Sequence, residues 1–358
     1  MWDYLLLLHQ FLKDMNFKRF YLILCILVVD VFLFSHNSLA QDNGFNINTL
    51  RLEARADFDY FSVNDSSYSG LRGKFINFVF SGQINEKFSY NYRQRINIAN
   101  IGGSKTFFQG TDWMYLTYHA SKNFSFSAGK QCLGVGGWEY DLPPIDVYFA
   151  SEFWDKFNCY EITASASFTD NSKNNTLTFQ FSNSPFITEP LQSLYGYNLI
   201  WYGKMGFFKT SYSLNMFEYR KDHYISYIAL GNAFDFGDFT CYLDFMNRAH
   251  GDQYRYFFSD MTVIAEAKYK FAEKWSVFAK GGYDINEAQD VDTPIDEYYD
   301  LAVLPGTDCY FYGIGGEFFP LKGKNDIRIH SFFAVKTNDV TTCQFNLGLT
   351  WRINFKQN

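Results

Sequence analysis

The chain has 358 residues, a formal net charge of −7 at pH 7, and aromatic residues at 21% of its positions. The acidic balance argues against a general nucleic-acid surface. No stretch after residue 40 contains the ~20 consecutive apolar residues of a membrane-spanning helix. So many Phe and Tyr residues are unusual in a soluble domain and typical of proteins with aromatic belts at both membrane interfaces.

The first segment, residues 1–40, has the pattern of a secretory signal peptide. Lys18 and Arg19 form a basic patch, and an apolar run follows from 20 to 34. Ser38-Leu39-Ala40 then supplies the small residues that a signal peptidase needs. We therefore expect cleavage after residue 40.

The alternative for this segment is a signal anchor that is retained. Its apolar run is short for a membrane span and is interrupted by Asp30, which favours cleavage. The residues before Met15 add nothing to a signal peptide, so Met15 is the expected start. The sequence predicts one further domain, an outer-membrane barrel over 41–358.

The next segment, 49–60, alternates strictly between two kinds of side chain. Its apolar positions are Leu50, Leu52, Ala54, Ala56, Phe58 and Tyr60. Its charged positions are Arg51, Glu53, Arg55, Asp57 and Asp59. Side chains along a strand point to opposite faces with period two, so one face suits lipid and the other suits water.

Similar segments continue to the end of the chain. Strands are predicted at 49–60, 72–83, 88–98, 111–119, 124–131, 157–168, 176–182, 194–202, 207–217, 224–234, 239–248, 258–270, 275–284, 309–319, 326–335 and 342–355. An even number of antiparallel strands is typical of single-chain bacterial barrels. The predicted fold class is all-β: a transmembrane up-and-down β-barrel of about 16 strands.

The connectors between these strands support a barrel over a soluble sandwich. Short, polar turns such as 85–87 and 272–274 alternate with longer connectors such as 132–156 and 285–308. Outer-membrane barrels have this asymmetry between periplasmic turns and external loops. An aromatic residue follows each of five short turns and is expected in the periplasmic girdle: Phe88, Phe124, Phe207, Phe239 and Trp275. The last strand ends in Trp351, Ile353 and Phe355. This aromatic close resembles the terminal signal by which the barrel-assembly machinery recognises its substrates.

Basic residues fall on the predicted water-facing side of several strands. The candidate pore-lining positions are Arg51, Arg55, Arg93, Arg95, Lys130, Arg328 and Arg352. Closing a barrel places its last strand beside its first, so most of these side chains should gather on one sector of the wall. Strands eleven and twelve contribute a more acidic sector with Asp244, Asp260, Glu266 and Lys268.

The long connector 132–156 is acidic and aromatic. Its candidate constriction residues are Trp138, Glu139, Tyr140, Asp141, Asp146 and Glu152. If this loop folds inward, its carboxylates face the arginines across a narrow aqueous gap and create a transverse field. The alternative is that the arginines form ion pairs with Glu53, Asp57 and the loop carboxylates. The two arrangements are compatible.

This part of the chain resembles a known family. The motifs are Ser127-Ala128-Gly129-Lys130-Gln131, Gly136-Gly137-Trp138-Glu139-Tyr140-Asp141, Pro143-Pro144-Ile145-Asp146-Val147-Tyr148 and Ser151-Glu152-Phe153. They are similar to the fifth strand and third loop of the phosphate-selective porin O/P family. The resemblance implies a homotrimeric outer-membrane porin that passes small hydrophilic solutes, phosphate-like anions among them, with the third loop as its constriction.

Two other functions remain as alternatives. A barrel enzyme needs a nucleophile beside a base, and the histidines after residue 40 (His119, His223, His250 and His330) lie in no recognisable catalytic motif. A surface interaction protein would use its loops, and the acidic segment 285–308 offers carboxylates without the spacing of a calcium loop. No catalytic, metal or cofactor site is predicted.

Five cysteines follow the predicted signal peptide, without the spacing of metal ligands. Cys132 and Cys159 bracket the long connector and are candidates for a bridge at its base. Unpaired cysteines that act as small apolar residues are the alternative.

Overall fold

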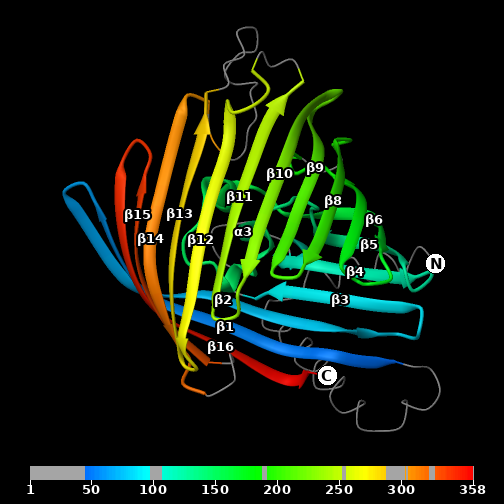
Figure 1. Cartoon of the computed structure of the whole chain (residues 1–358), viewed down its shortest axis with the longest axis horizontal. Coiled ribbons are helices and arrows are strands. Elements are labelled where there is room, and N and C mark those ends of the chain that lie inside the picture. Colours follow the sequence, from blue (N-terminus) through cyan, green and yellow to red (C-terminus); the bar gives the residue numbers. More distant parts are fainter. Residues whose placement is uncertain are drawn as a thin grey trace, which may run out of the picture. The chain divides into compact units, whose positions relative to one another are not determined.

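The computed structural model describes residues 45–96, 107–187, 192–251, 255–287, 303, 305–321 and 327–357. Asn46–Asn358 form one compact unit, in which sixteen antiparallel strands close into a barrel (Figure 1). The predicted fold class is therefore confirmed. The predicted signal peptide lies outside the described residues.

Each strand pairs with its neighbours along the chain, and β1 also pairs with β16 to complete the cylinder. The strands are β1 Asn46–Val63, β2 Ser66–Gln83, β3 Phe88–Arg95, β4 Thr111–His119, β5 Phe124–Cys132, β6 Tyr160–Thr169, β7 Asn175–Asn183, β8 Tyr195–Met205, β9 Phe208–Arg220, β10 His223–Asp235, β11 Phe239–His250, β12 Asp260–Ala272, β13 Trp275–Asn286, β14 Thr307–Phe318, β15 Ile327–Thr337 and β16 Thr341–Gln357. Closure satisfies the hydrogen-bonding groups that an edge strand would expose to lipid.

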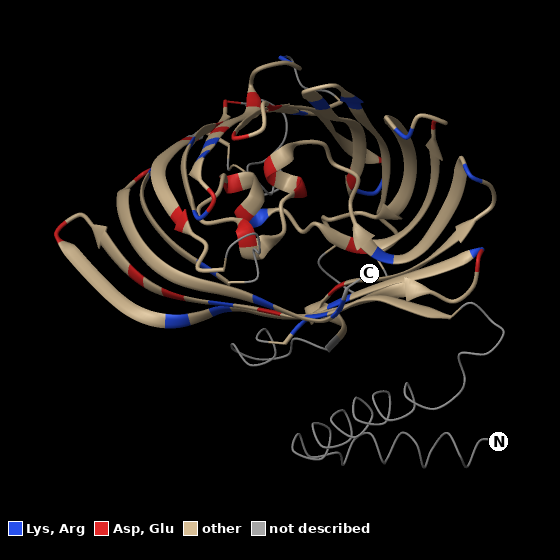
Figure 2. Cartoon of the chain, turned by 60° about the horizontal axis from the view of Figure 1, so that its bottom comes forward, with Lys and Arg blue, Asp and Glu red and all other residues tan. Residues whose placement is uncertain are grey.

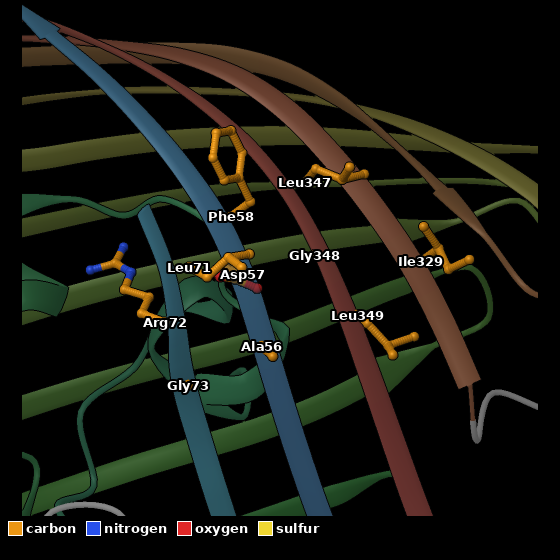
Figure 3. Close-up of a pocket in the computed structure, with 10 residues that line it drawn as sticks. All are labelled: Ala56, Asp57, Phe58, Leu71, Arg72, Gly73, Ile329, Leu347, Gly348 and Leu349. Carbon is orange, nitrogen blue, oxygen red and sulfur yellow. The ribbon is translucent and has the colours of Figure 1, made fainter. Parts of the chain in front are cut away.

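The outward side of the wall is apolar, as the alternation predicted. Phe58, Leu347 and Leu349 line a shallow hollow on the outside of the seam between β1 and β16 (Figure 3). The five residues expected in the aromatic girdle are all exposed, between 38% for Phe88 and 55% for Phe207. Phe207 lies in a short turn and the other four begin the strands that follow such turns, so the five side chains form an exposed aromatic band near one end of the barrel.

The two ends of the barrel differ in their connectors. Six described connectors at one end span five residues or fewer: 84–87, 120–123, 170–174, 206–207, 236–238 and 273–274. The other end carries 133–159 and 184–194 as well as tight turns at 64–65 and 221–222. We call these the turn end and the loop end. Within the described ranges, no helix is long and apolar enough to cross a membrane.

The connector 133–159, which we call the constriction loop, folds into the barrel. Its helical segments are α3 Trp138–Asp141, η3 Pro144–Asp146 and α4 Glu152–Lys156. Figure 2 shows these segments, with their acidic residues, enclosed by the strands. A further short helix, η2 Phe107–Gly110, precedes β4. The loop therefore occupies part of the interior of the barrel.

Candidate functional site: the constriction loop and the arginine wall

The first part of the constriction loop is attached to β9, β10 and β11. The Gly136 amide donates to Ser213 Oγ at 2.8 Å. Asp244 Oδ2 accepts the amides of Trp138 and Glu139, both at 2.8 Å, at the start of α3. These amides have no partner within the helix, and a carboxylate favours the positive end of the helix dipole.

The backbone of the loop lies very close to this wall. A Cβ atom on Gly231 of β10 would lie 2.8 Å from the Cα atom of Gly137. Gly137 itself has φ of +115°, in a region that side chains with a Cβ rarely adopt. Glycines on both partners therefore allow the loop to approach the strand.

The middle of the loop is fixed by a buried ion pair. Lys280 Nζ of β13 lies 2.6 Å from Glu139 Oε1, and the two side chains are only 3% and 2% exposed. Glu139 also accepts the Ser151 amide at 3.2 Å. Asp284 of β13 accepts the Glu152 amide at 3.0 Å at the start of α4. Wall carboxylates therefore hold the beginnings of both α-helices.

The third attachment joins the loop to arginines on the wall strands β15 and β16. Asp146 of η3 lies 2.6 Å from Arg328 of β15 and 2.8 Å from Arg352 of β16. Burial alone would raise the pKa of Asp146, but the two guanidinium groups outweigh this effect and hold the pKa below its usual value. The loop is thus anchored on opposite sides of the barrel and crosses the lumen.

Arg55 is the most enclosed of the predicted pore-lining residues. Its Nη2 atom lies 2.8 Å from Asp57 Oδ2, and both side chains are 0% exposed. Its Nη1 atom donates to the carbonyl of Val147 at 2.8 Å. Asp57 also lies 3.3 Å from His330 Nε2. This contact crosses β16 at Gly348, where a Cβ would lie 2.3 Å from both partners.

The other arginines of β1 and β3 share two carboxylates. Glu53 lies 2.9 Å from Arg51 and 3.3 Å from Arg352. Asp112 lies 3.1 Å from Arg93 and 2.7 Å from Arg95. Strands distant in sequence therefore bring their charges together, as expected from barrel closure.

Lys130 is placed differently from the arginines. It pairs in register with Met114 and Ile162. Its ammonium group donates to the carbonyl of Phe108 in η2 at 3.1 Å and lies 5.0 Å from that ring. The structure therefore ties Lys130 to the connector between β3 and β4.

The arginines of the cluster differ in how far water reaches them. Side-chain exposure is 27% for Arg51 and 21% for Arg95, but only 2% for Arg93 and 0% for Arg55. The predicted ion pairs are present in the geometry. Arg51 and Arg95 are thus the two arginines of this group whose side chains remain most accessible to solvent.

The remaining constriction residues have separate environments. Tyr140 is buried in an apolar cluster with Phe153, Phe157 and Phe217. Trp138 begins α3 and is half-buried. Asp141 is exposed to solvent and accepts a hydrogen bond from Tyr202 Oη at 3.1 Å. The surrounding wall and loop displace much of the bulk water around Asp141 and raise its pKa to about 7.

This pKa predicts a pH-dependent charge in the lumen. Below pH 7 the carboxyl of Asp141 is mostly neutral, and above pH 7 it is mostly ionised. We therefore expect that lowering the pH from 8 to 6 shifts the reversal potential in a salt gradient toward anion preference. Other groups also titrate, so the diagnostic quantity is the difference between the wild type and Asp141→Asn. An identical pH profile for the two proteins contradicts the prediction.

Several residues that hold the site were not predicted from the sequence. Asp112 is the extra residue of a β-bulge between β3 and β4, an irregularity that alternation does not reveal. Lys280 and Asp284 lie on a strand with no obvious charged face. One signal suggests the capping roles of Asp244 and Asp284. Each of these carboxylates lies on a wall strand, and the loop contains helical segments whose first amides need acceptors.

The positions of the described residues add little support to the two alternative functions, a barrel enzyme and a surface interaction protein. His119 Nε2 lies 3.0 Å from Ser89 Oγ on an exposed surface, but a hydroxyl–imidazole contact alone is not a catalytic triad. Among the described residues, no group of three or more His, Cys, Asp or Glu is placed to hold a metal ion. Cys132 and Cys159 are free thiols. Most of the acidic segment 285–308 lies outside the described residues.

Comparison with known proteins agrees with this architecture. Residues 49–206, which include most of β1, all of β2 to β8 and the constriction loop, match the family model described as phosphate-selective porin O and P. This segment is therefore similar to that family. The predicted resemblance is thus confirmed over this part of the chain. No curated protein matches the chain.

Solved porin structures share the fold at low sequence identity. The outer-membrane channel DcaP of Acinetobacter baumannii is 15% identical with a TM-score of 0.59, and the match covers 87% of this chain and 98% of that one. OmpT of Vibrio cholerae is 9% identical with a TM-score of 0.55, covering 88% and 100%. OccK2 of Pseudomonas aeruginosa, solved with glucuronate, is 9% identical with a TM-score of 0.51, covering 87% and 100%. The family match and the shared barrel fold together indicate a porin channel of the outer membrane.

Proposed function

We propose that this protein is an outer-membrane porin through which small hydrophilic solutes diffuse passively, with a weak preference for anions. The observation that supports this proposal most directly is the constriction loop, which crosses a closed barrel and is held on both sides by charged side chains. Such a loop narrows a wide cylinder, and polar groups at the constriction give it selectivity.

The near balance of positive and negative side chains on the wall supports a weak rather than a strong preference for anions. Arg51, Arg93 and Arg95 share Glu53 and Asp112, so each positive charge of this group lies beside a negative one. A site dedicated to phosphate would need cationic donors that remain available to the solute. We therefore propose general permeation of small polar solutes, with phosphate-like anions among them.

The proposal includes the path of the protein to the membrane. We propose cleavage of residues 1–40, recognition of the aromatic last strand by the barrel-assembly machinery, and a homotrimer in outer-membrane lipid. Exposed Ile353 and Phe355 near the end of β16 support the terminal signal. The resemblance to porins supports the trimer.

The test of selectivity uses the two more exposed arginines. We expect the double variant Arg51→Gln/Arg95→Gln to shift the reversal potential toward cation preference, because Glu53 and Asp112 keep their charge. The shift should be a few millivolts to about 20 mV in a tenfold KCl gradient, since screening reduces the effect of each surface charge.

Planar-bilayer recording checks this result, with Lys122→Gln in the turn after β4 as a control that removes one distant exposed charge. An unchanged reversal potential in the double variant, with normal conductance, would show that these arginines do not govern permeation.

A further inference from the structure

A cavity of about 370 Å³ lies between the constriction loop and the wall formed by β1, β2 and β14 to β16. It is on the loop-end side of the loop, because Phe61 and Thr342 lie close to the turns that join β1 to β2 and β15 to β16. Arg72 and Asp155, with side chains 45% and 53% exposed, connect it to solvent. Its volume suits one small molecule.

Hydrogen-bond donors predominate at the surface of this cavity. Arg72, Lys74 and Lys336 line it, whereas Asp155 is the one acidic residue in the lining. Lys74 is the extra residue of a β-bulge between β1 and β2. A bulge redirects side chains relative to the regular alternation, which is how β2 places a second cation beside Arg72.

Two carboxylates that balance these cations, Asp59 and Glu152, do not line the cavity, whereas Asp155 lines it and lies 3.1 Å from Lys336 Nζ. Asp59 is 3% exposed and accepts hydrogen bonds from Arg72, Gln344 and Asn346. Glu152 is 8% exposed and pairs with Lys156 and Lys336. Both are therefore engaged with the protein, while the cations keep part of their surface toward the cavity. A guanidinium has five N–H donors, and Asp59 uses only one side of Arg72.

The other surface of the cavity is aromatic. Phe61, Phe75 and Phe311 come from the wall, and Tyr148, Phe149 and Trp154 come from the loop. The guanidinium of Arg72 lies 5.9 Å from the centre of the Phe61 ring, so the cationic and aromatic surfaces adjoin. Aromatic rings bind flat apolar groups through offset or edge-to-face contacts.

We propose that this cavity is a binding site for small carboxylates that carry an aromatic ring, with the carboxylate toward Arg72, Lys74 and Lys336 and the ring against the aromatic surface. The inference rests on the proposed porin function and adds a solute class to it. Binding beside the constriction loop raises the local concentration of such solutes where they must enter the narrow part of the channel.

The test compares three probes on the wild-type protein in planar bilayers: phenylacetate, acetate and benzyl alcohol. Acetate has the charge without the ring, and benzyl alcohol has the ring without the charge. We expect phenylacetate added at the loop end to interrupt the KCl current at concentrations at least tenfold lower than either of the others, since it engages both surfaces.

Variants then assign the site. Arg72→Gln and Lys336→Gln should each weaken the phenylacetate block by about tenfold, because each removes a charge-assisted hydrogen bond. Phe61→Leu should weaken the block by phenylacetate but not that by acetate. Lys209→Gln is the matched control, because Lys209 is also an exposed, ion-paired lysine but lies at the turn end. The KCl conductance of each variant shows that its barrel has folded.

The outcomes distinguish failure of the proposed binding site from failure of the proposed porin function. A wild-type protein that conducts KCl but is blocked equally by phenylacetate and acetate overturns the proposed site and leaves the porin intact. A protein that carries no current but binds phenylacetate calorimetrically in detergent, with loss of binding in Arg72→Gln, supports the site and overturns the porin. Equal weakening by Lys209→Gln also overturns the site.

Discussion

Replacing residues 137–156 with a short glycine–serine linker should raise the single-channel conductance several-fold. The constriction loop crosses the lumen from β11 to β16, so its removal widens the narrowest part of the channel. The barrel should still form, because its strands pair with one another and not with the loop. The Leu133 amide already donates to the Cys159 carbonyl at 2.8 Å, so a short linker can close the hairpin between β5 and β6.

The measurement is the distribution of conductance steps for the wild type and the deletion variant in the same salt. Heat-modifiable migration of the detergent-solubilised protein would show that both barrels are folded. Asp244, Lys280 and Asp284 lose their partners in the loop, but water then reaches them and solvates their charges. Unchanged conductance in a folded deletion variant would mean that the loop does not limit the channel.

Replacing Lys280 with methionine should release the constriction loop from the wall. Lys280 and Glu139 are almost fully buried, and removing one partner of such a pair costs about 3–5 kcal/mol, because the other charge stays buried without compensation. The expected results are proteolytic cleavage within the loop and a noisier current. The double variant Lys280→Met/Glu139→Gln should recover much of the wild-type behaviour, since the glutamine has no charge and can still accept the Ser151 amide.

The matched control is Lys209→Met, which breaks an ion pair at the turn end. Lys209 and Asp235 are 34% and 43% exposed, so the loss should be at most about 1 kcal/mol. A double-mutant cycle on the proteolytic cleavage within the loop gives the coupling free energy between Glu139 and Lys280. Equal loop cleavage in Lys280→Met and Lys209→Met would show that the buried pair does not hold the loop.

The barrel could be predicted from the sequence because period-two alternation repeats in most of the strands, although the fourth, eighth and tenth alternate poorly. The predicted strand 111–119 coincides with β4, and 49–60 lies within β1, Asn46–Val63. Each strand of a membrane barrel faces lipid on one side, so its pattern is informative without knowledge of its partners. The gathering of the arginines on one sector could be predicted because closing the barrel places β16 beside β1.

The way the loop is held could not be predicted in the same way. Asp244 caps α3 from 105 residues away in sequence, a pairing that no local pattern encodes. Asp112 and Lys74 depend on bulges, which change the direction of a side chain without changing the apolar pattern. The acidic character of the loop was visible, but the partner of each carboxylate required the folded barrel.

The central claim is that this chain forms an open, water-filled barrel narrowed by its constriction loop. Single-channel recording of the purified wild-type protein in planar bilayers tests it most directly. We predict discrete current steps that scale with salt concentration and increase several-fold when residues 137–156 are replaced. A correctly folded, bilayer-inserted protein that carries no current, with or without the loop, would contradict the claim.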